Sequence, residues 1–232
     1  MDLSVRSMAP EEMDAPSTSA EEYAICLRDL AAVNRVTFTH RPTLNWLARV
    51  TRDLPREKPI TILDIACGHG DLLRAIHRWA AKRNLPVHLS GLDLNPRSAD
   101  VAAAATPPDM PIVWLTGDVF TYNPEPSPDF IVTSQFAHHL TDAELVTFIA
   151  WLNRHAARGW FIADLHRHAL AYYGFPILAR LAGWHRIVRE DGQISIARSF
   201  RRPEWINLLA AAGISAEIKW RLPFRYCVGA LK

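Results

Sequence analysis

The chain has 232 residues, 49% hydrophobic and 22% charged, which suits one globular α/β domain with an appended segment better than two full domains. Its 26 basic and 24 acidic residues give a net charge of +2, too balanced to predict nucleic-acid binding from the overall field. No run reaches the ~20 apolar residues of a membrane span, and the acidic N-terminus lacks a signal-peptide core.

The three cysteines, Cys26, Cys67 and Cys227, are far apart in the chain and odd in number. Because they form no metal-type spacing, we expect reduced thiols and, by default, a cytoplasmic protein. Neither a nucleic acid nor a membrane is expected as a partner, and the chain is expected to be a monomer or a homodimer.

Residues 1–58 are predicted to form a helical cap before the sheet begins. The first 20 residues suggest a mobile lead-in, or one short helix after Ala9-Pro10. Apolar residues then recur at helical spacing from Glu21 to about Phe38, and a second helix is expected from Pro42 to Val50. These helices either cover a ligand as a lid or simply pack on the edge of the sheet.

The stretch from Thr61 to Trp79 reads as a strand, a glycine turn and a helix. A short apolar run ends in Asp64-Ile65-Ala66-Cys67-Gly68-His69-Gly70, and a helical pattern starts at Asp71. Glycines let the chain turn sharply and let a ligand approach main-chain N–H groups. The end of such a strand is where open parallel sheets bind ligands.

The residues after Gly70 argue against the commoner nucleotides. Leu73 stands where a dinucleotide fingerprint needs its third glycine, and no Lys-Ser/Thr pair follows as in a phosphate loop. Asp71 at the helix start would also repel a pyrophosphate. An acidic glycine turn suits instead a nucleoside that carries an amino group and a positive charge, such as S-adenosylmethionine.

This turn resembles the first motif of the class I, Rossmann-like S-adenosylmethionine-dependent methyltransferases, with Ala66 in the first glycine place. The resemblance covers residues 59–232 and implies a doubly wound, seven-stranded α/β sheet, mostly parallel with an antiparallel last strand, behind an N-terminal helical lid. It implies S-adenosylmethionine as cofactor and S-adenosylhomocysteine as product. The turn residues expected to bind the cofactor are Asp64, Ala66, Cys67, Gly68 and Gly70.

The next two strands carry acids at the places that the family uses. Val87 to Leu94 is predicted as strand two, and its Asp93 is expected to bind both ribose hydroxyls, with Leu94 beside it; capping of the next helix is the alternative. Strand three, Ile112 to Thr116, is followed by Asp118 and Val119. By resemblance, Asp118 accepts from the adenine amino group and the Val119 N–H reaches the ring.

Strand four, Asp129 to Ser134, runs into Gln135-Phe136-Ala137-His138-His139. By topology this loop faces the cofactor near its methyl group, so Ser134 and Gln135 are expected cofactor contacts and Phe136 a substrate contact. Histidine has a pKa suited to general-base catalysis. One histidine, His139 slightly preferred over His138, is the predicted base; contact with the methionine moiety or the core is the alternative.

Strand five, Gly159 to Leu165, is followed by His166-Arg167-His168 and an aromatic helical stretch from Ala169 to Trp184. His166, Tyr172 and Tyr173 are predicted to line the acceptor pocket, although core packing explains the aromatic residues equally well. Asp164, His166 and His168 invite a metal site, but strand four ends without an acid and histidine is a poor Mg²⁺ ligand. No metal is therefore predicted.

The rest of the chain is predicted to complete the sheet. Glu190-Asp191-Gly192 is interpreted as a turn, and a helix is expected from about Pro203 to Ala212, where Gly213 stops it. Two alternating segments, Ile214 to Leu222 and Phe224 to Leu231, read as a closing pair of strands. The family resemblance implies that the second strand is antiparallel to the others.

These features predict an enzyme that methylates a small molecule. We expect O-methylation of a phenolic, quinone-like or polyketide-like acceptor by in-line displacement, as in the ubiquinone-biosynthesis-like and secondary-metabolite branches of the family. Ser134-Gln135-Phe136-Ala137 contains no proline, unlike the turn of base-amine methylases. The alternative readings are a protein or RNA methyltransferase and a cofactor-binding subunit without its own turnover.

Overall fold

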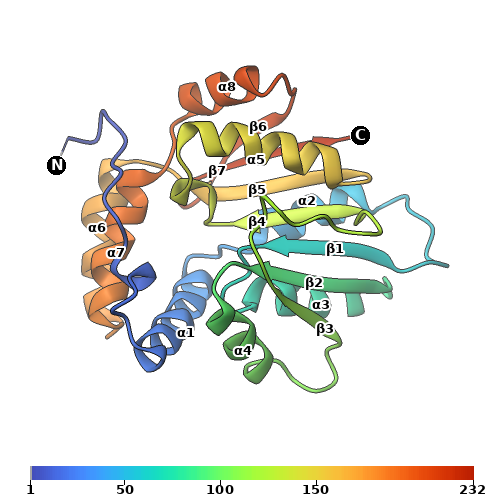
Figure 1. Cartoon of the computed structure of the whole chain (residues 1–232), viewed down its shortest axis with the longest axis horizontal. Coiled ribbons are helices and arrows are strands. Elements are labelled where there is room, and N and C mark those ends of the chain that lie inside the picture. The colour runs from blue at the N-terminus through green and yellow to red at the C-terminus, as the bar shows by residue number, and fades with distance from the viewer. Residues whose placement is uncertain (1) are drawn as a thin grey trace.

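The computed structural model describes residues 2–232. A seven-stranded sheet with the strand order β3-β2-β1-β4-β5-β7-β6 forms its centre, as Figure 1 shows. The first half of the chain contributes these elements: η1 (Glu12–Asp14), α1 (Ala20–Val36), α2 (Arg41–Val50), β1 (Ile60–Ile65), α3 (Asp71–Ala81), β2 (Val87–Asp93), α4 (Pro96–Ala104) and β3 (Ile112–Thr116).

The second half completes the sheet and both helical layers. Its elements are β4 (Phe130–Ser134), η2 (Ala137–His139), α5 (Asp142–His155), β5 (Gly159–Leu165), α6 (Ala169–Leu181), α7 (Arg186–Arg198), α8 (Arg202–Ala211), β6 (Glu217–Arg221) and β7 (Arg225–Leu231). Strands β1 to β5 pair in parallel, whereas β7 runs antiparallel to β5 and to β6. The predicted Rossmann-like fold with an antiparallel last strand is confirmed.

Two apolar layers cover the faces of the sheet. One cluster joins the sheet to α2 and α3 through residues such as Trp46, Leu73 and Ile76, and the other joins it to α5 and α8 through Phe148 and Trp205. Because helices cover both sides, β4 is buried along almost its whole length. This rigid double layer fixes where the carboxyl ends of the parallel strands lie.

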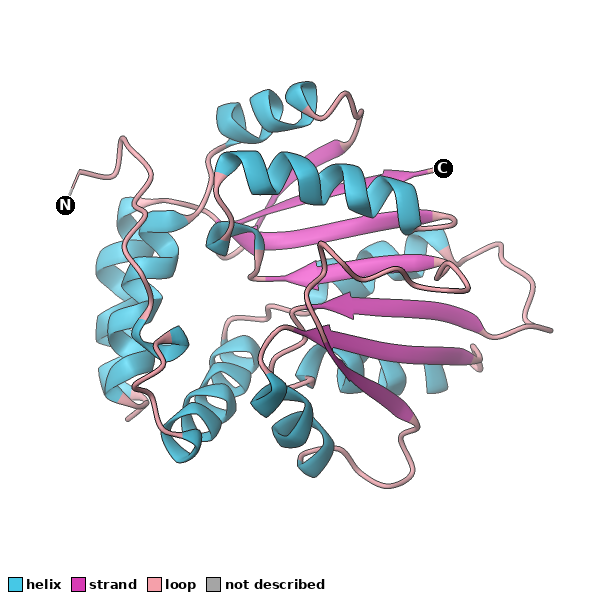
Figure 2. Ribbon diagram, viewed as in Figure 1, coloured by secondary structure: helices cyan, strands magenta, loops and turns pink. Residues whose placement is uncertain are grey.

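Figure 2 shows a group of helices beyond that edge of the sheet, with the N-terminal segment running along them. They are α1, α6 and α7, and α6 and α7 pack as a pair. Helix α1 contacts α4 and α7, whereas α2 packs on β5. The two predicted N-terminal helices therefore lie in different places, one over the strand ends and the other on a face of the sheet.

Local signals explain where several helices begin. Thr141 accepts from the Glu144 N–H while the Glu144 carboxylate accepts from the Thr141 N–H, so the predicted capping box of α5 is confirmed. Ser19 and Glu22 form the same arrangement at α1. Gly213, with a φ of +66°, ends α8 as predicted.

The predicted turn at Glu190-Asp191-Gly192 is wrong, because these residues lie inside α7. Packing against α6 overrides the turn-prone composition. A Cβ on Gly192 would lie 2.0 Å from the Phe175 Cε1 atom, so this glycine permits the close approach of two helices. The Asp191 carboxylate accepts from the N–H groups of Glu12 and Met13, which explains a buried acid at this position.

Candidate functional site

The glycine turn after β1 uses the left-handed conformation at alternate residues. Ala66, Gly68 and Gly70 have φ values of +57°, +49° and +78°. A Cβ on Gly70 would come within 2.3 Å of Trp114, so packing against β3 requires glycine there, whereas at Gly68 the nearest atom is a Leu27 methyl 3.5 Å away on α1. Gly68 therefore faces a space between the turn and the helix above it.

Asp93, at the end of β2, anchors the turn. Its two carboxylate oxygens accept from the Gly68 N–H at 2.8 Å and from the Asn95 N–H at 2.9 Å. Burial raises the pKa of this carboxyl, although these hydrogen bonds oppose the rise. A carboxylate has about four acceptor sites, so two remain for a ligand that presents paired hydroxyl groups.

Asp64 is the most deeply placed acid of the site, with 2% of its surface exposed. Burial, together with the charges of Asp71 and Asp93, raises its pKa well above the ordinary value. Within residues 2–232, no group donates a hydrogen bond to its side chain. A buried carboxylate without a donor is costly, and a cationic ligand would relieve that cost.

The pKa of Asp71, at the first position of α3, is lowered, whereas that of Asp64 is raised. Burial disfavours its charge, but hydrogen bonds from His40 at 2.8 Å and Asn34 at 3.0 Å outweigh burial and hold its pKa at about 2. The Asn34 carbonyl also accepts from the Gln135 amide at 2.7 Å. Asn34 of α1 thus connects the glycine turn to the loop after β4, a link that the sequence analysis missed.

The segment after β3 presents the predicted adenine-binding groups. One oxygen of Asp118 accepts from the Phe120 N–H at 2.9 Å, which leaves the other oxygen available. Val119 is buried, and its N–H finds no partner among the described residues, 2–232. Leu94 and Phe120 are 72% and 37% exposed, so apolar surface lies near the two acids for a planar ring.

The loop after β4 contains two unusual groups. The Ser134 hydroxyl is buried and has no hydrogen-bond partner among the described residues, 2–232. Gln135 adopts a left-handed φ of +58°, which is uncommon for a residue with a side chain and concentrates at functional sites. An orphaned hydroxyl next to a strained residue indicates a place where a ligand completes the hydrogen bonding.

His138 and His139 each have a carboxylate on the Nδ1 side of the ring. His138 Nδ1 lies 2.7 Å from Asp164 Oδ1, and His139 Nδ1 lies 3.3 Å from Asp14 Oδ2. Charge and hydrogen bonding from His138 outweigh burial and lower the pKa of Asp164. Burial lowers the pKa of His139, but Asp14 and Glu11 outweigh burial and raise it. Asp164 therefore holds His138 in one orientation.

Residues 3–14, here termed the N-terminal strap, bring Glu11 and Asp14 to these histidines. The Arg6 guanidinium donates to the His138 carbonyl at 2.8 Å and pairs with Asp142 at 2.9 Å. Arg198 of α7 donates to the carbonyls of His138, His139 and Ala9. The strap is thus bound on both sides, so the predicted one-turn helix exists as η1 within an ordered segment.

The predicted acceptor-binding residues lie in several places. Phe136 packs on Phe148 with ring centroids 5.2 Å apart and adds to the core. His166 contacts Tyr226 and accepts from the Trp220 indole N–H, and burial lowers its pKa to about 4, aided by neighbouring cations. Tyr172 is half-buried and Tyr173 exposed on α6. These contacts do not join the histidine pair.

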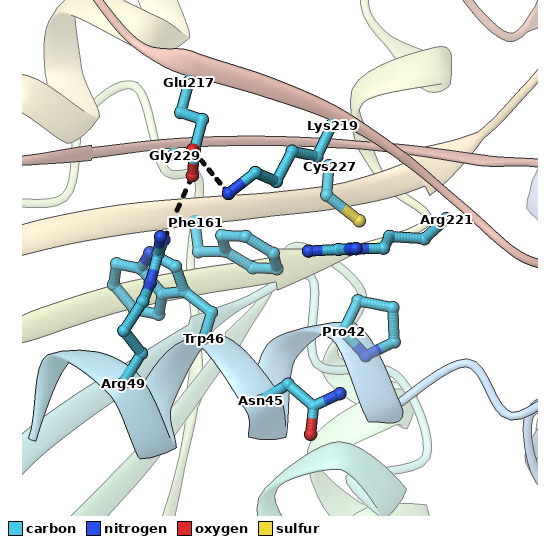
Figure 3. A pocket seen from close by; sticks show the side chains of 10 residues that line it. All are labelled: Pro42, Asn45, Trp46, Arg49, Phe161, Glu217, Lys219, Arg221, Cys227 and Gly229. Atoms are coloured by element: carbon cyan, nitrogen blue, oxygen red, sulfur yellow. Dashed lines mark hydrogen bonds and ion pairs between the residues drawn. The ribbon is translucent and has the colours of Figure 1, made fainter. Parts of the chain in front are cut away.

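A separate hollow of about 190 Å³ lies between α2 and the strands β6 and β7, as Figure 3 shows. Glu217 pairs there with Arg49 at 3.1 Å and with Lys219 at 2.5 Å. The stacked rings of Trp46 and Phe161 form part of its lining. It contains none of the residues predicted to bind the cofactor.

The sequence analysis did not predict the contacts of Asp164, Glu11, Asp14 and Asn34 with the site, and only the first of these could have been found from a pattern in the sequence. Asp164 ends β5 as Asp64 and Asp93 end their strands, so the same rule about strand ends could have found its role. Glu11, Asp14 and Asn34 come from segments that precede the sheet, and no local pattern relates them to residues more than a hundred positions away.

Similarity to known proteins agrees with this site, which combines two acids at strand ends, a left-handed glycine turn and a histidine loop. Residues 62–159 match the family model of the methyltransferase domain. This part of the chain is therefore similar to a methyltransferase domain. A search of curated protein sequences found no match.

Solved structures of methyltransferases have the same fold. The plantazolicin methyltransferase BpumL, in complex with a monoazolic desmethylPZN analog and SAH, has a TM-score of 0.68 at 13% identity over 91% of this chain and 90% of that one. Magnesium protoporphyrin IX methyltransferase from Synechocystis PCC 6803 has a TM-score of 0.54 at 16% identity, covering 84% and 82%. The citrinin polyketide synthase CMeT domain has 0.61 at 13%, covering 83% and 52%.

These likenesses, all at low identity, concern the fold. The match of residues 62–159 to a methyltransferase domain supports a methyl-transferring enzyme. Within residues 2–232, no helix combines the length and the apolarity needed to cross a membrane.

Proposed function

We propose that the chain transfers a methyl group from S-adenosylmethionine to a hydroxyl of a small phenolic, quinone-like or polyketide-like acceptor. The observation that carries this proposal is a histidine pair whose rings are held by carboxylates, at the strand edge where a nucleoside site is also built. Two of the solved neighbours act on small molecules by their names, protoporphyrin and plantazolicin analogs, which supports this acceptor class.

Each polar group of the site has a proposed partner on the cofactor. In our proposal Asp93 binds the ribose hydroxyls through its two remaining acceptor sites, and Asp118 and the Val119 N–H bind adenine. Asp64, a buried carboxylate without a protein donor, takes the positive methionine end. Ser134 supplies an unsatisfied hydroxyl beside it. The cofactor provides the electrophilic methyl group, and the protein orients the reactants and excludes water.

In our proposal, the Nε2 atom of one histidine removes the proton of the acceptor hydroxyl. Because carboxylates hold Nδ1 of both rings, Nε2 is the nitrogen left to accept a proton. His139 is 29% exposed whereas His138 is 2% exposed, so His139 is the one an acceptor reaches more readily. His138 and Asp164 then act behind it, as a buried support for the loop.

The test is a panel of phenols, quinols and polyketide-like hydroxyl compounds with isotopically labelled cofactor, plus peptide and RNA pools. We expect turnover with a phenolic compound and a loss of ~10²–10⁴-fold in turnover for His139→Asn. The cofactor affinity, measured by calorimetry, should stay within a few-fold and serves as the folding control. If His138→Asn and His139→Asn each turn over as fast as the native enzyme, a histidine base is excluded.

Other outcomes of the same panel address the alternatives. Labelling confined to peptide or RNA would identify a macromolecular methyltransferase, and cofactor binding without any labelled product would indicate an accessory subunit. Either result would overturn the small-molecule proposal while leaving the cofactor assignment in place.

A further inference from the structure

Glu11, His138 and His139 converge on one point in space although the strap and the histidine loop are far apart in sequence. Glu11 Oε1 lies 3.6 Å from His138 Nε2, and Glu11 Oε2 lies 3.8 Å from His139 Nε2. Each residue contributes one ligand-type atom to a group within 4.8 Å of one another. These separations exceed hydrogen-bonding distance, but they resemble the ~3–4 Å between two ligands that each lie ~2.1 Å from one metal.

Both imidazoles have a carboxylate on the side away from that point, and Glu11 accepts a hydrogen bond on the oxygen that faces His138. Asp164 holds Nδ1 of His138 at 2.7 Å, and Asp14 holds Nδ1 of His139 at 3.3 Å. The Ser195 hydroxyl donates to Glu11 Oε1 at 2.9 Å. A carboxylate on the remote ring nitrogen is the usual outer shell of a metal-binding histidine, because it fixes the tautomer that leaves Nε2 unprotonated.

The local charge also favours a cation. Glu11, Asp14 and Asp164 surround the two imidazoles, and the side chains of Glu11, His138 and Asp164 are 8%, 2% and 0% exposed. The nearby arginines, Arg6 and Arg198, donate to main-chain carbonyls of this loop, not to these three carboxylates. Three carboxylates around two imidazoles favour a bound cation, and a divalent ion would offset their mutual repulsion.

We propose that Glu11, His138 and His139 bind one divalent transition-metal ion. Two imidazoles and one carboxylate on one side of the ion suit zinc, manganese, iron or cobalt better than magnesium, which prefers oxygen ligands, and they leave coordination positions open. A cavity of about 680 Å³ lined by Glu11, Asp14 and His139 gives an exogenous ligand access to those positions.

Metal occupancy changes the chemistry available at the histidine loop. The ion would occupy both Nε2 lone pairs, so proton removal by histidine belongs to the metal-free protein. An acceptor oxygen bound at an open position would lose its proton to solvent through coordination instead. The metal site itself does not depend on the identity of the acceptor or on the proposed O-methylation.

The test uses full-length protein without a histidine tag, stripped with a chelator and titrated with Co²⁺ and with Zn²⁺. We expect one ion per chain by calorimetry and elemental analysis, and Co²⁺ should produce visible absorption typical of mixed nitrogen and oxygen ligands. Glu11→Gln and His139→Asn should each weaken binding at least ~10–100-fold. His166→Asn, which removes a histidine outside the group, should bind the ion as the native chain does.

S-adenosylhomocysteine affinity measured on the same samples separates the two proposals, because the cofactor residues are not metal ligands. Retained S-adenosylhomocysteine binding in the variants confirms that they fold. Two results would overturn the metal site. One is that the stripped native chain binds no ion specifically, and the other is that Glu11→Gln binds the ion as tightly as the native chain. Either result would show that the three residues form only a hydrogen-bonded cluster of acids and imidazoles.

Discussion

At the scale of single residues, Asp64 combines a cost to the fold with a proposed role in binding the cofactor. It is 2% exposed and its pKa is raised by burial and by two neighbouring acids. A carboxyl whose folded pKa exceeds its unfolded value of 3.8 destabilises the folded state as the pH rises above that value. At neutral pH this carboxyl therefore costs the ligand-free fold stability, and a cationic ligand offsets that cost.

Asp64→Asn should accordingly raise the stability of the ligand-free protein at pH 7, by about 1 kcal/mol or more, and weaken S-adenosylmethionine binding. The stability gain over native protein should shrink as the pH falls toward the unfolded pKa of 3.8, because the folded carboxyl is protonated at a higher pH than the unfolded one. Urea denaturation and calorimetry measure the two effects. Asp109→Asn, at an exposed position, is the matched control. A variant that is less stable at pH 7 yet binds normally would contradict this account.

At the scale of elements, the junction between α1, α2 and the glycine turn depends on Asp71. Asn34 of α1 and His40, which precedes α2, both hydrogen bond to its carboxylate. The helix N-terminus adds favourable interaction with the negative charge. The hydrogen bond from Asn34 links α1 to Asp71, so it connects the predicted cofactor residues to the helix that covers them.

The lowered pKa of Asp71 fixes the sign of an acid effect. Because its folded pKa of about 2 lies below the unfolded 3.8, its stabilisation is present above pH 3.8 and is lost as the pH falls toward 2. Asp71→Asn should lose ~1–3 kcal/mol at pH 6 and show a smaller difference from the native chain at pH 2.5. Thermal unfolding at both pH values measures this, and an equal difference at both would refute it.

The contact between α6 and α7 is a second element-scale feature, and Gly192 determines it. The Phe175 ring occupies the space where a Cβ would lie, with the nearest carbon 2.0 Å away. Gly174, on α6, has no atom within 4 Å of its own ideal Cβ. The two helical glycines therefore differ in environment and form a matched pair for substitution.

Gly192→Ala should destabilise the chain by ~1–3 kcal/mol through overpacking, whereas Gly174→Ala should be neutral or stabilise by up to ~1 kcal/mol. Phe175→Leu should recover part of the Gly192→Ala loss, since it removes the ring that the new methyl group meets. Denaturant unfolding of the single and double variants measures the coupling. Strictly additive effects would place the cause outside this contact.

At the scale of the whole molecule, residues from both ends of the chain and from its middle meet at one edge of the sheet. The Leu3 carbonyl accepts from Arg167 at 3.0 Å and from Arg201 at 2.6 Å, and Ser7 pairs with Ala197. The strap, α1 and α7 thus lie beyond the ends of β1, β2 and β4, and hydrogen bonds join the strap to segments far away in the sequence. A ligand bound there contacts elements from distant parts of the sequence and should stabilise the fold as a unit.

Saturating S-adenosylhomocysteine, at ~100 times its Kd, should add ~2.7 kcal/mol and raise the melting temperature by ~5–11 °C for a chain of this size. In Asp93→Ala, which lacks the carboxylate held by the turn, the same concentration should give a much smaller shift. Differential scanning fluorimetry with and without ligand is sufficient. An unchanged shift in the variant would remove Asp93 from the site.

The amino-acid sequence alone determined the elements whose residues are contiguous or follow the regular alternation of strands and helices. Asp64 to Gly70, Asp93 and Asp118 are recognisable because each lies at the end of a predicted strand, and parallel strands end at one edge. The alternation predicted β7 as a strand, and the family resemblance supplied its antiparallel direction. The capping box at Thr141 needed only four residues.

Only the tertiary structure decided which side chains surround the histidines. Glu11 and Asp14 reach them because arginines on other elements bind the strap, and Asn34 bridges two loops about a hundred residues apart. α7 forms across turn-prone residues because its packing against α6 and η1 outweighs local preference. Such contacts depend on how separate segments fill shared space, which a local pattern of residues does not encode.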